Sequence, residues 1–260
     1  MGKTNIAVNL AISIKRLGYT VVVIDVDFGL ANVEIVTGIN IKHTISDAII
    51  NYKKIEEIMA DGPEGIKIIS GGFGLHEKII MNDKNINFFL KEMEKLEDSV
   101  DFIIIDTGAG VSMELLNFIM AADETVLITT PDPTSIMDSY TILKALTMKG
   151  YKGKLNIVAN IVNNRKEAYE TYNKLFKASK NFLNQELQFL GFLERDDIVN
   201  KAVKNQCPFI ISNPNSSISK RINIMALKFA DPSKYKRKER KSFVSKLIEL
   251  FAVRGGFNGR

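Results

Sequence analysis

Short, almost wholly apolar runs alternate with longer amphipathic segments along most of this chain, and this alternation constrains the fold more than any other feature. The runs suit strands buried on both faces, and the amphipathic segments suit crossover helices. We therefore expect the α/β class, with a doubly wound, mainly parallel sheet and helices on both faces. The predicted strands cover residues 21–24, 66–69, 102–105, 125–129, 155–161 and 187–193, and the predicted helices cover residues 5–17, 44–59, 84–97, 112–121, 134–149, 165–184, 196–206 and 216–229.

The composition indicates a globular protein of the cytoplasm. The chain has 260 residues, of which 45% are hydrophobic and 25% charged, enough to bury a sizeable core. Its one cysteine, Cys207, cannot form an internal disulfide, and the first residues do not form an export signal. No apolar stretch approaches the roughly 20 residues that span a bilayer. We therefore expect any membrane contact to be made from the surface.

The positive charge of the chain is concentrated at its C-terminal end. Residues 231–260 hold nine Lys or Arg and three Asp or Glu, which leaves 26 basic and 27 acidic residues for residues 1–230. A globular surface that holds nucleic acid would spread its basic excess over the folded body. Nucleic acid is therefore not an expected partner of the body.

Carboxylates follow two of the predicted strands. Asp25 and Asp27 come directly after residues 21–24, and Asp106 comes after residues 102–105 and begins a Thr-Gly-Ala-Gly turn. In an open parallel sheet, ligands bind beyond the carboxyl ends of the strands. Carboxylates beside a glycine turn suit a magnesium nucleotide, although the same residues also cap strands and turn the chain in other proteins.

The N-terminus contains part of a phosphate-binding pattern. Gly2-Lys3-Thr4 matches the end of G-x-x-x-x-G-K-[ST], and residues 5–17 continue as the helix expected after such a loop. In this pattern the backbone N–H groups surround phosphates, lysine neutralises their charge and the hydroxyl binds Mg²⁺.

Together, these motifs resemble the MinD/ParA family of deviant P-loop ATPases over almost the whole chain. The segment from Asp25 to Asn32 resembles the first switch, D-x-D-x-G-L-A-N, and the segment from Asp106 to Gly110 resembles the second. Gly62-Pro63-Glu64-Gly65 followed by Ser70-Gly71-Gly72 is similar to a further family stretch. The Leu-Ala-Asn and Thr-Gly-Ala-Gly choices favour the FlhG group of flagellar regulators, also called FleN or YlxH, over MinD itself.

The resemblance implies a role for each matching residue. Asp27 would orient the attacking water, Lys3 would contact the β and γ phosphates, and Asn160 would read adenine, unless it is only a turn residue. The implied site consists of Asp27 and Lys3 for catalysis, Gly2, Lys3, Thr4, Asn5 and Asn160 for the nucleotide, and Thr4, Asp25 and Asp106 for Mg²⁺.

The resemblance also implies a cellular role. The expected protein is an ATP-dependent homodimer that regulates flagellar number and position, peripheral at the inner face of the cell membrane, with ATP hydrolysis as its switch. Its implied partners are the flagellar GTPase FlhF and basal-body or transcription-regulator proteins. Three alternatives stay open: a MinD-type regulator of the division site, a ParA-type DNA-partitioning protein and a catalytically impaired interaction module of the same fold.

The family's first strand and the first glycines of its phosphate loop would lie before Met1. We therefore expect residues 1–230 to be an N-terminally incomplete ATPase domain, which leaves the ATPase activity of the chain as given open. The absent strand is normally central in the sheet. Its loss would leave two ladders of unpaired backbone groups, at a cost of many kcal/mol against a total stability of about 5 to 15 kcal/mol.

The tail has the pattern of a membrane anchor. Residues 231–242 form a basic linker, and residues 243–254 form a helix whose apolar side chains fall on one stripe. Such a helix suits a bilayer interface with anionic lipids, and docking on the protein's own core is the alternative. The predicted membrane residues are Phe243, Val244, Leu247, Ile248 and Phe251.

Overall fold

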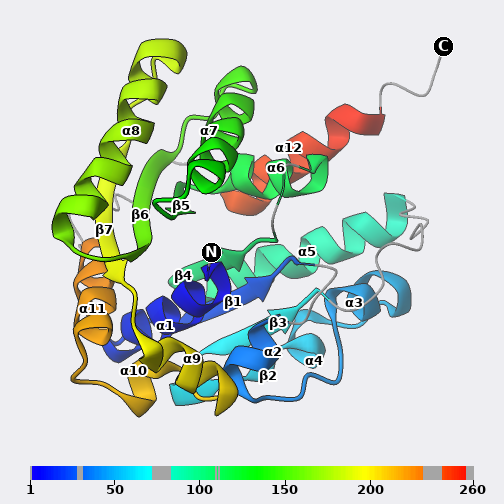
Figure 1. Cartoon of the computed structure of the whole chain (residues 1–260). Helices are drawn as coiled ribbons and strands as arrows, with labels where there is room; N and C mark the ends of the chain where they lie inside the picture. Colours follow the sequence, from blue (N-terminus) through cyan, green and yellow to red (C-terminus); the bar gives the residue numbers. More distant parts are fainter. Residues whose placement is uncertain are drawn as a thin grey trace. The chain divides into compact units, whose positions relative to one another are not determined.

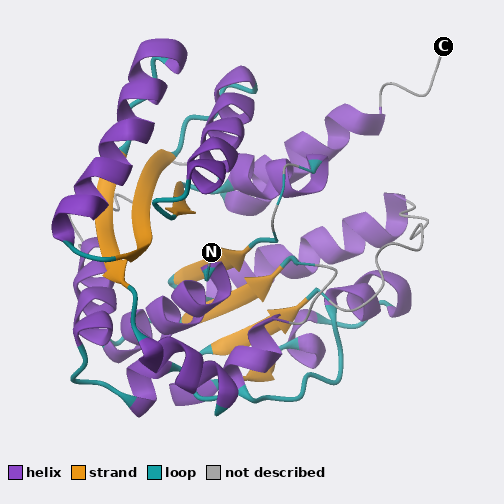
Figure 2. Cartoon of the chain, in the orientation of Figure 1, coloured by secondary structure: helices purple, strands orange, loops and turns teal. Residues whose placement is uncertain are grey.

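The computed structural model describes residues 2–27, 32–71, 83–108, 110, 112–230 and 242–255. The chain divides into two compact units. Unit 1 comprises Met1–Gly2, Gly110–Asp197 and Ser245–Arg260, and unit 2 comprises Lys3–Ala109 and Ile198–Val244. Figure 1 labels the elements in chain order, and Figure 2 separates helices from strands. Residues 28–31 of the first switch motif, Gly72, Ala109 and the basic run at 231–241 lie outside the described residues.

Unit 2 contains a four-stranded sheet in the order β2-β3-β1-β4. Its central strand β1 pairs in parallel with β3 and β4, and the two-residue β2 pairs antiparallel with β3. The strands are β1 Val21–Asp25, β2 Ala60–Asp61, β3 Lys67–Ser70 and β4 Phe102–Asp106, and the helices are α1 Lys3–Arg16, α2 Asn32–Thr37, α3 Ile45–Asn51, α4 Ile55–Ile58, the 3₁₀ turn η1 Pro63–Gly65, α5 Asp83–Ser99, α9 Asp197–Lys204, α10 Phe209–Ser212 and α11 Ser217–Phe229.

Helix α1 is buried on most of its circumference, because it packs against β1, β4 and α11. Val8, Ala11 and Ile12 have no exposed surface. Two polar side chains of α1 are satisfied by distant backbone or side-chain groups: Asn9 Oδ1 accepts from the Ile210 N–H at 2.9 Å, and the Ser13 hydroxyl donates to Asn223 at 2.6 Å. These contacts fix the helix, and therefore the position of its N-terminus.

Unit 1 contains a three-stranded parallel sheet in the order β5-β6-β7. Its apolar core includes Leu143, Leu146, Ile157 and Leu175, all fully buried. The strands are β5 Glu124–Thr129, β6 Lys154–Val162 and β7 Gln188–Glu194, and the helices are α6 Met113–Ala121, α7 Pro133–Met148 and α8 Arg165–Leu183. The last helix, α12 Phe243–Gly255, begins in unit 2 and continues in unit 1.

The α/β class with parallel strands and helices on both faces is confirmed, but the predicted single sheet appears as two sheets. Among the described residues, β4 pairs only with β1 and β5 only with β6, so each of these strands has one edge without a partner strand. The predicted helix at 44–59 is also divided. Tyr52, at φ 53°, adopts the left-handed conformation that ends α3, and α4 then begins at Ile55.

Candidate functional site

Two carboxylates lie side by side at the carboxyl end of the unit 2 sheet. The parallel register of β1 and β4 pairs Asp25 with Asp106, as the positions of these residues after two apolar runs predict. Asp25 is 1% exposed and Asp106 is 3% exposed. The strands therefore place two acidic groups at one sheet edge, almost completely removed from solvent.

This burial shifts both titrations upward. The pKa of Asp25 rises from 3.8 to about 7, first because of desolvation and further because of the charges of Asp106 and Asp27. The pKa of Asp106 rises from 3.8 to about 6, mainly through desolvation, although the Thr4 hydroxyl and the Lys3 charge act in the opposite direction. Carboxylates that resist ionisation in this way are a common feature of functional sites.

The start of α1 reaches the same carboxylates. Thr4 hydrogen-bonds to the Asp106 carboxylate through its hydroxyl, and the Lys3 ammonium favours the ionised form of Asp106. Both residues belong to the first turn of α1, where backbone N–H groups have no partner within the helix. A lysine and a hydroxyl at a helix N-terminus suit a phosphate with its metal ion.

Asp27 is held close to this cluster by two residues. Its Oδ2 accepts from Asn32 Nδ2 at 3.1 Å, and its backbone N–H donates to Asp25 Oδ1 at 2.9 Å. A Cβ at Gly108 would lie 3.0 Å from Asp27 Cγ, so only glycine leaves room for the carboxylate there. The sequence analysis did not predict that Asn32 positions Asp27. The place of Asn32 at the start of α2, five residues after Asp27, could have indicated this contact.

The cluster has the chemistry of a magnesium site. Among the described residues, Asp106 Oδ2 is buried without a hydrogen-bond partner, so a cation or its water would satisfy it. In the same part of the chain no three His, Cys, Asp or Glu side chains could hold a metal ion between them. Mg²⁺ fits this pattern, because it usually keeps several waters and binds one or two carboxylates together with substrate phosphates.

Two predicted nucleotide residues, Gly2 and Asn160, belong to unit 1. Asn160 is 8% exposed near the end of β6, and a Cβ on Gly2 would lie 3.1 Å from its Nδ2. The next residue, Ile161, has φ 57°, which is unusual for a β-branched residue, at an irregularity in the pairing of β6 with β7. Bulges of this kind often re-aim a side chain beside a functional site. The adenine-reading role of Asn160 remains a prediction.

Asn5, the remaining predicted residue, lies in the first turn of α1. Its side-chain Oδ1 is buried without a partner among the described residues, while its backbone oxygen accepts from Asn9 Nδ2 at 2.7 Å. Together with the contacts given above, the described part of unit 2 brings Lys3, Thr4, Asp25, Asp27 and Asp106 close to one another, as the sequence predicts.

We expect Asp106→Asn to stabilise the protein at pH 8 in the absence of magnesium. A carboxyl with a raised folded pKa leaves the folded state binding more protons than the unfolded state, so stability falls as the pH rises from about 4 to about 7. The amide removes this loss and should raise the free energy of unfolding at pH 8 by about 1 to 3 kcal/mol, with little change at pH 4. Urea unfolding at pH 4 and at pH 8 measures this free energy of unfolding.

The exposed Asp98 of α5 offers the matched control, because Asp98→Asn removes the same charge from a solvated position. A lower stability of Asp106→Asn than of Asp98→Asn at pH 8 would contradict the stated cost of the buried charge. Magnesium should stabilise the wild type and Asp98→Asn, but not Asp106→Asn.

The predicted membrane helix is present as α12, and its apolar stripe is largely covered. Val244 and Leu247 have no exposed surface and Phe243 is 9% exposed, whereas Ile248 is 36% exposed. The side chain of Phe251 lies outside the described residues. No described helix combines the length and the apolar character that would be required to cross a bilayer.

Three polar residues not foreseen from the sequence hold α12. The Glu97 carboxylate of α5 accepts from the Phe243 N–H at 2.7 Å and from the Val244 N–H at 3.1 Å. It therefore caps the first turn of α12, where N–H groups lack partners within the helix. Further along, Lys246 Nζ donates to Asp123 at 2.7 Å and to the Ala121 carbonyl at 3.3 Å. Partners so distant in sequence leave no local signal.

Comparison with known proteins identifies a family model and several relatives that match most of the chain. The ParA family model, described as "NUBPL iron-transfer P-loop NTPase", matches residues 1–230. The chain is similar to the antiactivator FleN of Pseudomonas aeruginosa, with 30% identity over 88% of this chain and 81% of the relative. It is also similar to the flagellum site-determining protein YlxH of Helicobacter pylori, with 35% identity over 87% of this chain and 76% of the relative.

Solved structures support the fold assignment. The septum site-determining protein MinD of Pyrococcus horikoshii, in complex with Mg-ADP, superposes with a TM-score of 0.73 at 19% identity. The match covers 92% of this chain and 94% of that structure. At 19% identity, this similarity shows that the two proteins share the arrangement of their helices and strands.

Proposed function

Since the chain belongs to the ParA family of P-loop NTPases, we propose that it binds ATP with Mg²⁺ and that hydrolysis to ADP and phosphate switches it between two states. One observation carries the proposal: the register of β1 and β4 places Asp25 beside Asp106, and Thr4 at the start of α1 bonds to the same carboxylate. Neighbouring groups from three elements thus supply the hydroxyl and carboxylates that suit a magnesium nucleotide.

Each residue has a defined task in this proposal. Lys3 and the N–H groups of the first turn of α1 bind the phosphates, and Thr4 ligates the metal ion. Asp25 and Asp106 would hold Mg²⁺ through its water ligands, and the bound ion would neutralise charge on the phosphates. Asp27, fixed by Asn32, orients the attacking water and accepts its proton. Asn160 reads the adenine, and Gly2 and Asn5 line the nucleotide.

Similarity to FleN and YlxH over nearly nine tenths of the chain supports a regulator of flagellar number and position. In this proposal ATP closes a homodimer, and the dimer engages flagellar partners such as the GTPase FlhF, basal-body proteins or transcription regulators. Hydrolysis returns the monomer, so the nucleotide state decides when the partners are bound.

We also propose that α12 attaches the dimer to the inner face of the cell membrane. The apolar residues Val244 and Leu247 are covered in the described structure, so α12 must leave its place before they can enter a bilayer. Two weak anchors on one dimer bind far more tightly than a single anchor. Dimerisation would therefore strengthen attachment without a new contact.

Dimerisation in the presence of nucleotide tests this function. We expect Mg-ATP, but not Mg-ADP, to double the molar mass measured by light scattering after size exclusion. The measurement should use the chain as given and a version extended by any in-frame codons upstream of Met1. If Mg-ATP does not raise the molar mass of either version, the switch is excluded and the alternative, an interaction module that does not hydrolyse ATP, replaces it.

A further inference from the structure

Helix α11 of unit 2 carries exposed apolar side chains that the nucleotide-dependent function does not use. On its inner face, Ile218, Ile222 and Met225 are at most 3% exposed. On its outer face, Ile224 is 56% exposed and Leu227 is 57% exposed. A helix on the surface of a globular protein usually turns its apolar stripe to the core and polar side chains to water. The outer face of α11 departs from this pattern.

Two hydrogen bonds define how α11 lies against α1, its neighbour in Figure 1. The Ser13 hydroxyl donates to Asn223 Oδ1 at 2.6 Å, and the Tyr19 hydroxyl donates to the Ala230 carbonyl at 3.0 Å. The two bonds follow one another in the same order along both segments, so the helices run in the same direction. Residues between the two bonds on α1 therefore lie beside those between the two bonds on α11.

An exposed leucine lies between these bonds on each segment. Leu17 follows Ser13 by four residues, and Leu227 follows Asn223 by four residues. Each leucine therefore lies about one helical turn beyond the first bond and on the same side of its helix. Leu17 is 42% exposed. The exposed apolar side chains of α11 thus continue onto the neighbouring segment.

Lysines flank these apolar side chains. Lys220 and Lys228 are exposed and stand four residues before and after Ile224, on the same stripe of α11. The helix contains one further cation, Arg221, and no acidic residue. Its charge therefore favours an anionic partner. The α11 surface, as we name it, consists of Leu17, Lys220, Ile224, Leu227 and Lys228.

The sequence continues from α11 into the most basic segment of the chain. Residues 231–241 contain six Lys or Arg and two Asp or Glu. Because residue 231 follows α11 almost directly, a surface that attracts this segment also approaches the C-terminal end of α11. Clusters of basic residues next to a membrane-associated helix are typical of segments that bind anionic lipids.

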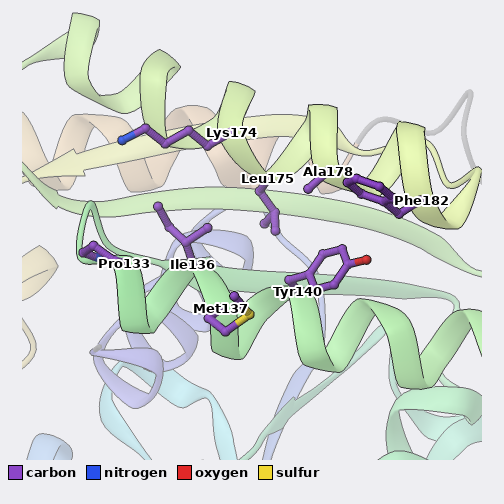
Figure 3. A pocket seen from close by; sticks show the side chains of 8 residues that line it. All are labelled: Pro133, Ile136, Met137, Tyr140, Lys174, Leu175, Ala178 and Phe182. Carbon is purple, nitrogen blue, oxygen red and sulfur yellow. The ribbon is translucent and has the colours of Figure 1, made fainter.

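The α11 surface has the shape that a bilayer interface accepts. It lies outside the apolar pocket of about 530 Å³ shown in Figure 3, whose eight lining residues all belong to α7 and α8 of unit 1. A small ligand or a partner helix is usually held in a concave site that covers its apolar face. An outward helix face with lysines beside apolar residues suits lipid instead, because lysine can lie along apolar surface and extend its ammonium to the headgroups. Nucleic-acid interfaces are more polar than this surface.

We propose that the α11 surface is a second membrane-contact site that lies on an anionic lipid bilayer. Leu17, Ile224 and Leu227 enter the interface, and the two lysines face lipid phosphates. The contact requires neither nucleotide nor movement of α12, because its apolar side chains are already exposed. It therefore brings the chain to the bilayer before α12 is released, and it can fail while the ATPase function stands.

An introduced tryptophan tests this contact specifically, because the chain contains no tryptophan of its own. The test uses the full chain as Leu227→Trp, without nucleotide, and vesicles of phosphatidylglycerol or phosphatidylcholine with brominated acyl chains. We expect phosphatidylglycerol vesicles to shift the emission to shorter wavelength and to quench most of it, and phosphatidylcholine vesicles to leave it unchanged.

Ile50→Trp is the matched control. Ile50 is 53% exposed on α3 of the same unit, and α3 contains no basic residue. We expect its emission to stay unchanged with both kinds of vesicle. Equal quenching of Leu227→Trp and Ile50→Trp, or quenching of neither, would overturn the proposal.

A charge-reversal variant tests the role of the lysines. Lys220→Glu should weaken binding to phosphatidylglycerol vesicles by about tenfold, because it removes one attractive charge and adds a repulsive one. Lys91→Glu changes the net charge equally at an exposed position on α5 of the same unit and should weaken binding much less. Equal losses would show that net charge alone attracts the chain, and the assignment to the α11 surface would be wrong. Circular dichroism confirms that each variant is folded.

Ile248→Trp separates this proposal from the proposed role of α12, because Ile248 is a partly exposed residue of that helix. If brominated vesicles quench Ile248→Trp but not Leu227→Trp, α12 is the anchor and the α11 surface does not contact lipid. If they quench Leu227→Trp alone, the α11 surface contacts lipid and the role proposed for α12 is wrong.

Two other partners of the α11 surface are outcomes of the same experiments. If the emission of Leu227→Trp shifts with protein concentration in the absence of vesicles, the surface binds a second copy and the proposal is wrong. If duplex DNA of random sequence binds the chain, and Lys220→Glu abolishes that binding while Lys91→Glu does not, the partner is nucleic acid and the proposal is equally wrong.

Discussion

Asp27→Ala is expected to leave ATP binding and dimerisation in place while lowering hydrolysis by about 10² to 10⁴-fold, the range of a positioned acid or base group. In the proposed mechanism, the substitution removes the carboxylate that orients water but leaves Lys3, Thr4 and Asp106 unchanged. It also removes a negative charge that raises the pKa of both Asp25 and Asp106. Phosphate release per dimer, with nucleotide affinity measured separately, distinguishes the two effects.

Lys3→Ala should give the opposite pattern. Loss of the ammonium removes the proposed contact with the phosphates and the charge that favours ionised Asp106, so nucleotide affinity should fall and the protein should stay monomeric. Asn32→Ala is the intermediate case, because it leaves Asp27 in place without its 3.1 Å hydrogen bond. We expect roughly a tenfold loss of hydrolysis for Asn32→Ala. If Asp27→Ala and Lys3→Ala behaved alike in nucleotide affinity, Asp27 would be an ordinary strand cap.

Glu97→Ala is expected to raise binding to anionic vesicles by about tenfold or more in the absence of nucleotide. The Glu97 carboxylate accepts both the Phe243 and the Val244 N–H, and loss of such charged hydrogen bonds costs roughly 1.5 to 3 kcal/mol each. The population of released α12 should therefore increase, which frees Val244 and Leu247 for the bilayer. Vesicle sedimentation measures the bound fraction.

Glu94 supplies the control for this experiment. It lies on the same helix α5, is exposed, and Glu94→Ala removes the same negative charge from the surface. Hydrogen exchange of the amides at residues 243–250 should accelerate in Glu97→Ala and not in Glu94→Ala. Faster exchange without increased vesicle binding would show that α12 is not the membrane anchor.

The sequence alone predicts that the carboxylates of Asp25 and Asp106 lie side by side. Apolar strand runs that end in Asp25 and Asp106 can bring these residues together only if the strands are parallel and adjacent, and the observed register confirms this. The residues of the candidate site could be predicted because they lie at strand ends and a helix start, which periodicity locates well. The position of α1 depends on its apolar burial, which the sequence displays, and on the hydrogen bonds of Asn9 and Ser13 to residues far along the chain, which it does not.

Other features depend on contacts that the local sequence does not encode. The left-handed residue Tyr52 breaks a continuous helical pattern that predicts one helix at 44–59. The strand pattern likewise predicts one sheet, and only the absence of the family's first strand indicated that the strands would divide into two. The Glu97 cap on α12 joins residues 146 positions apart, so the amphipathic stripe alone could not distinguish membrane binding from internal burial.

Vesicle sedimentation of the unmodified chain with Mg-ATP, with Mg-ADP and without nucleotide tests the central claim most directly. The claim is that nucleotide state controls membrane attachment through the dimer and α12. The account predicts at least tenfold tighter binding with Mg-ATP than in the other two states, because two anchors act together. The comparison includes the version extended upstream of Met1, and equal binding in all three states for both versions would contradict the account.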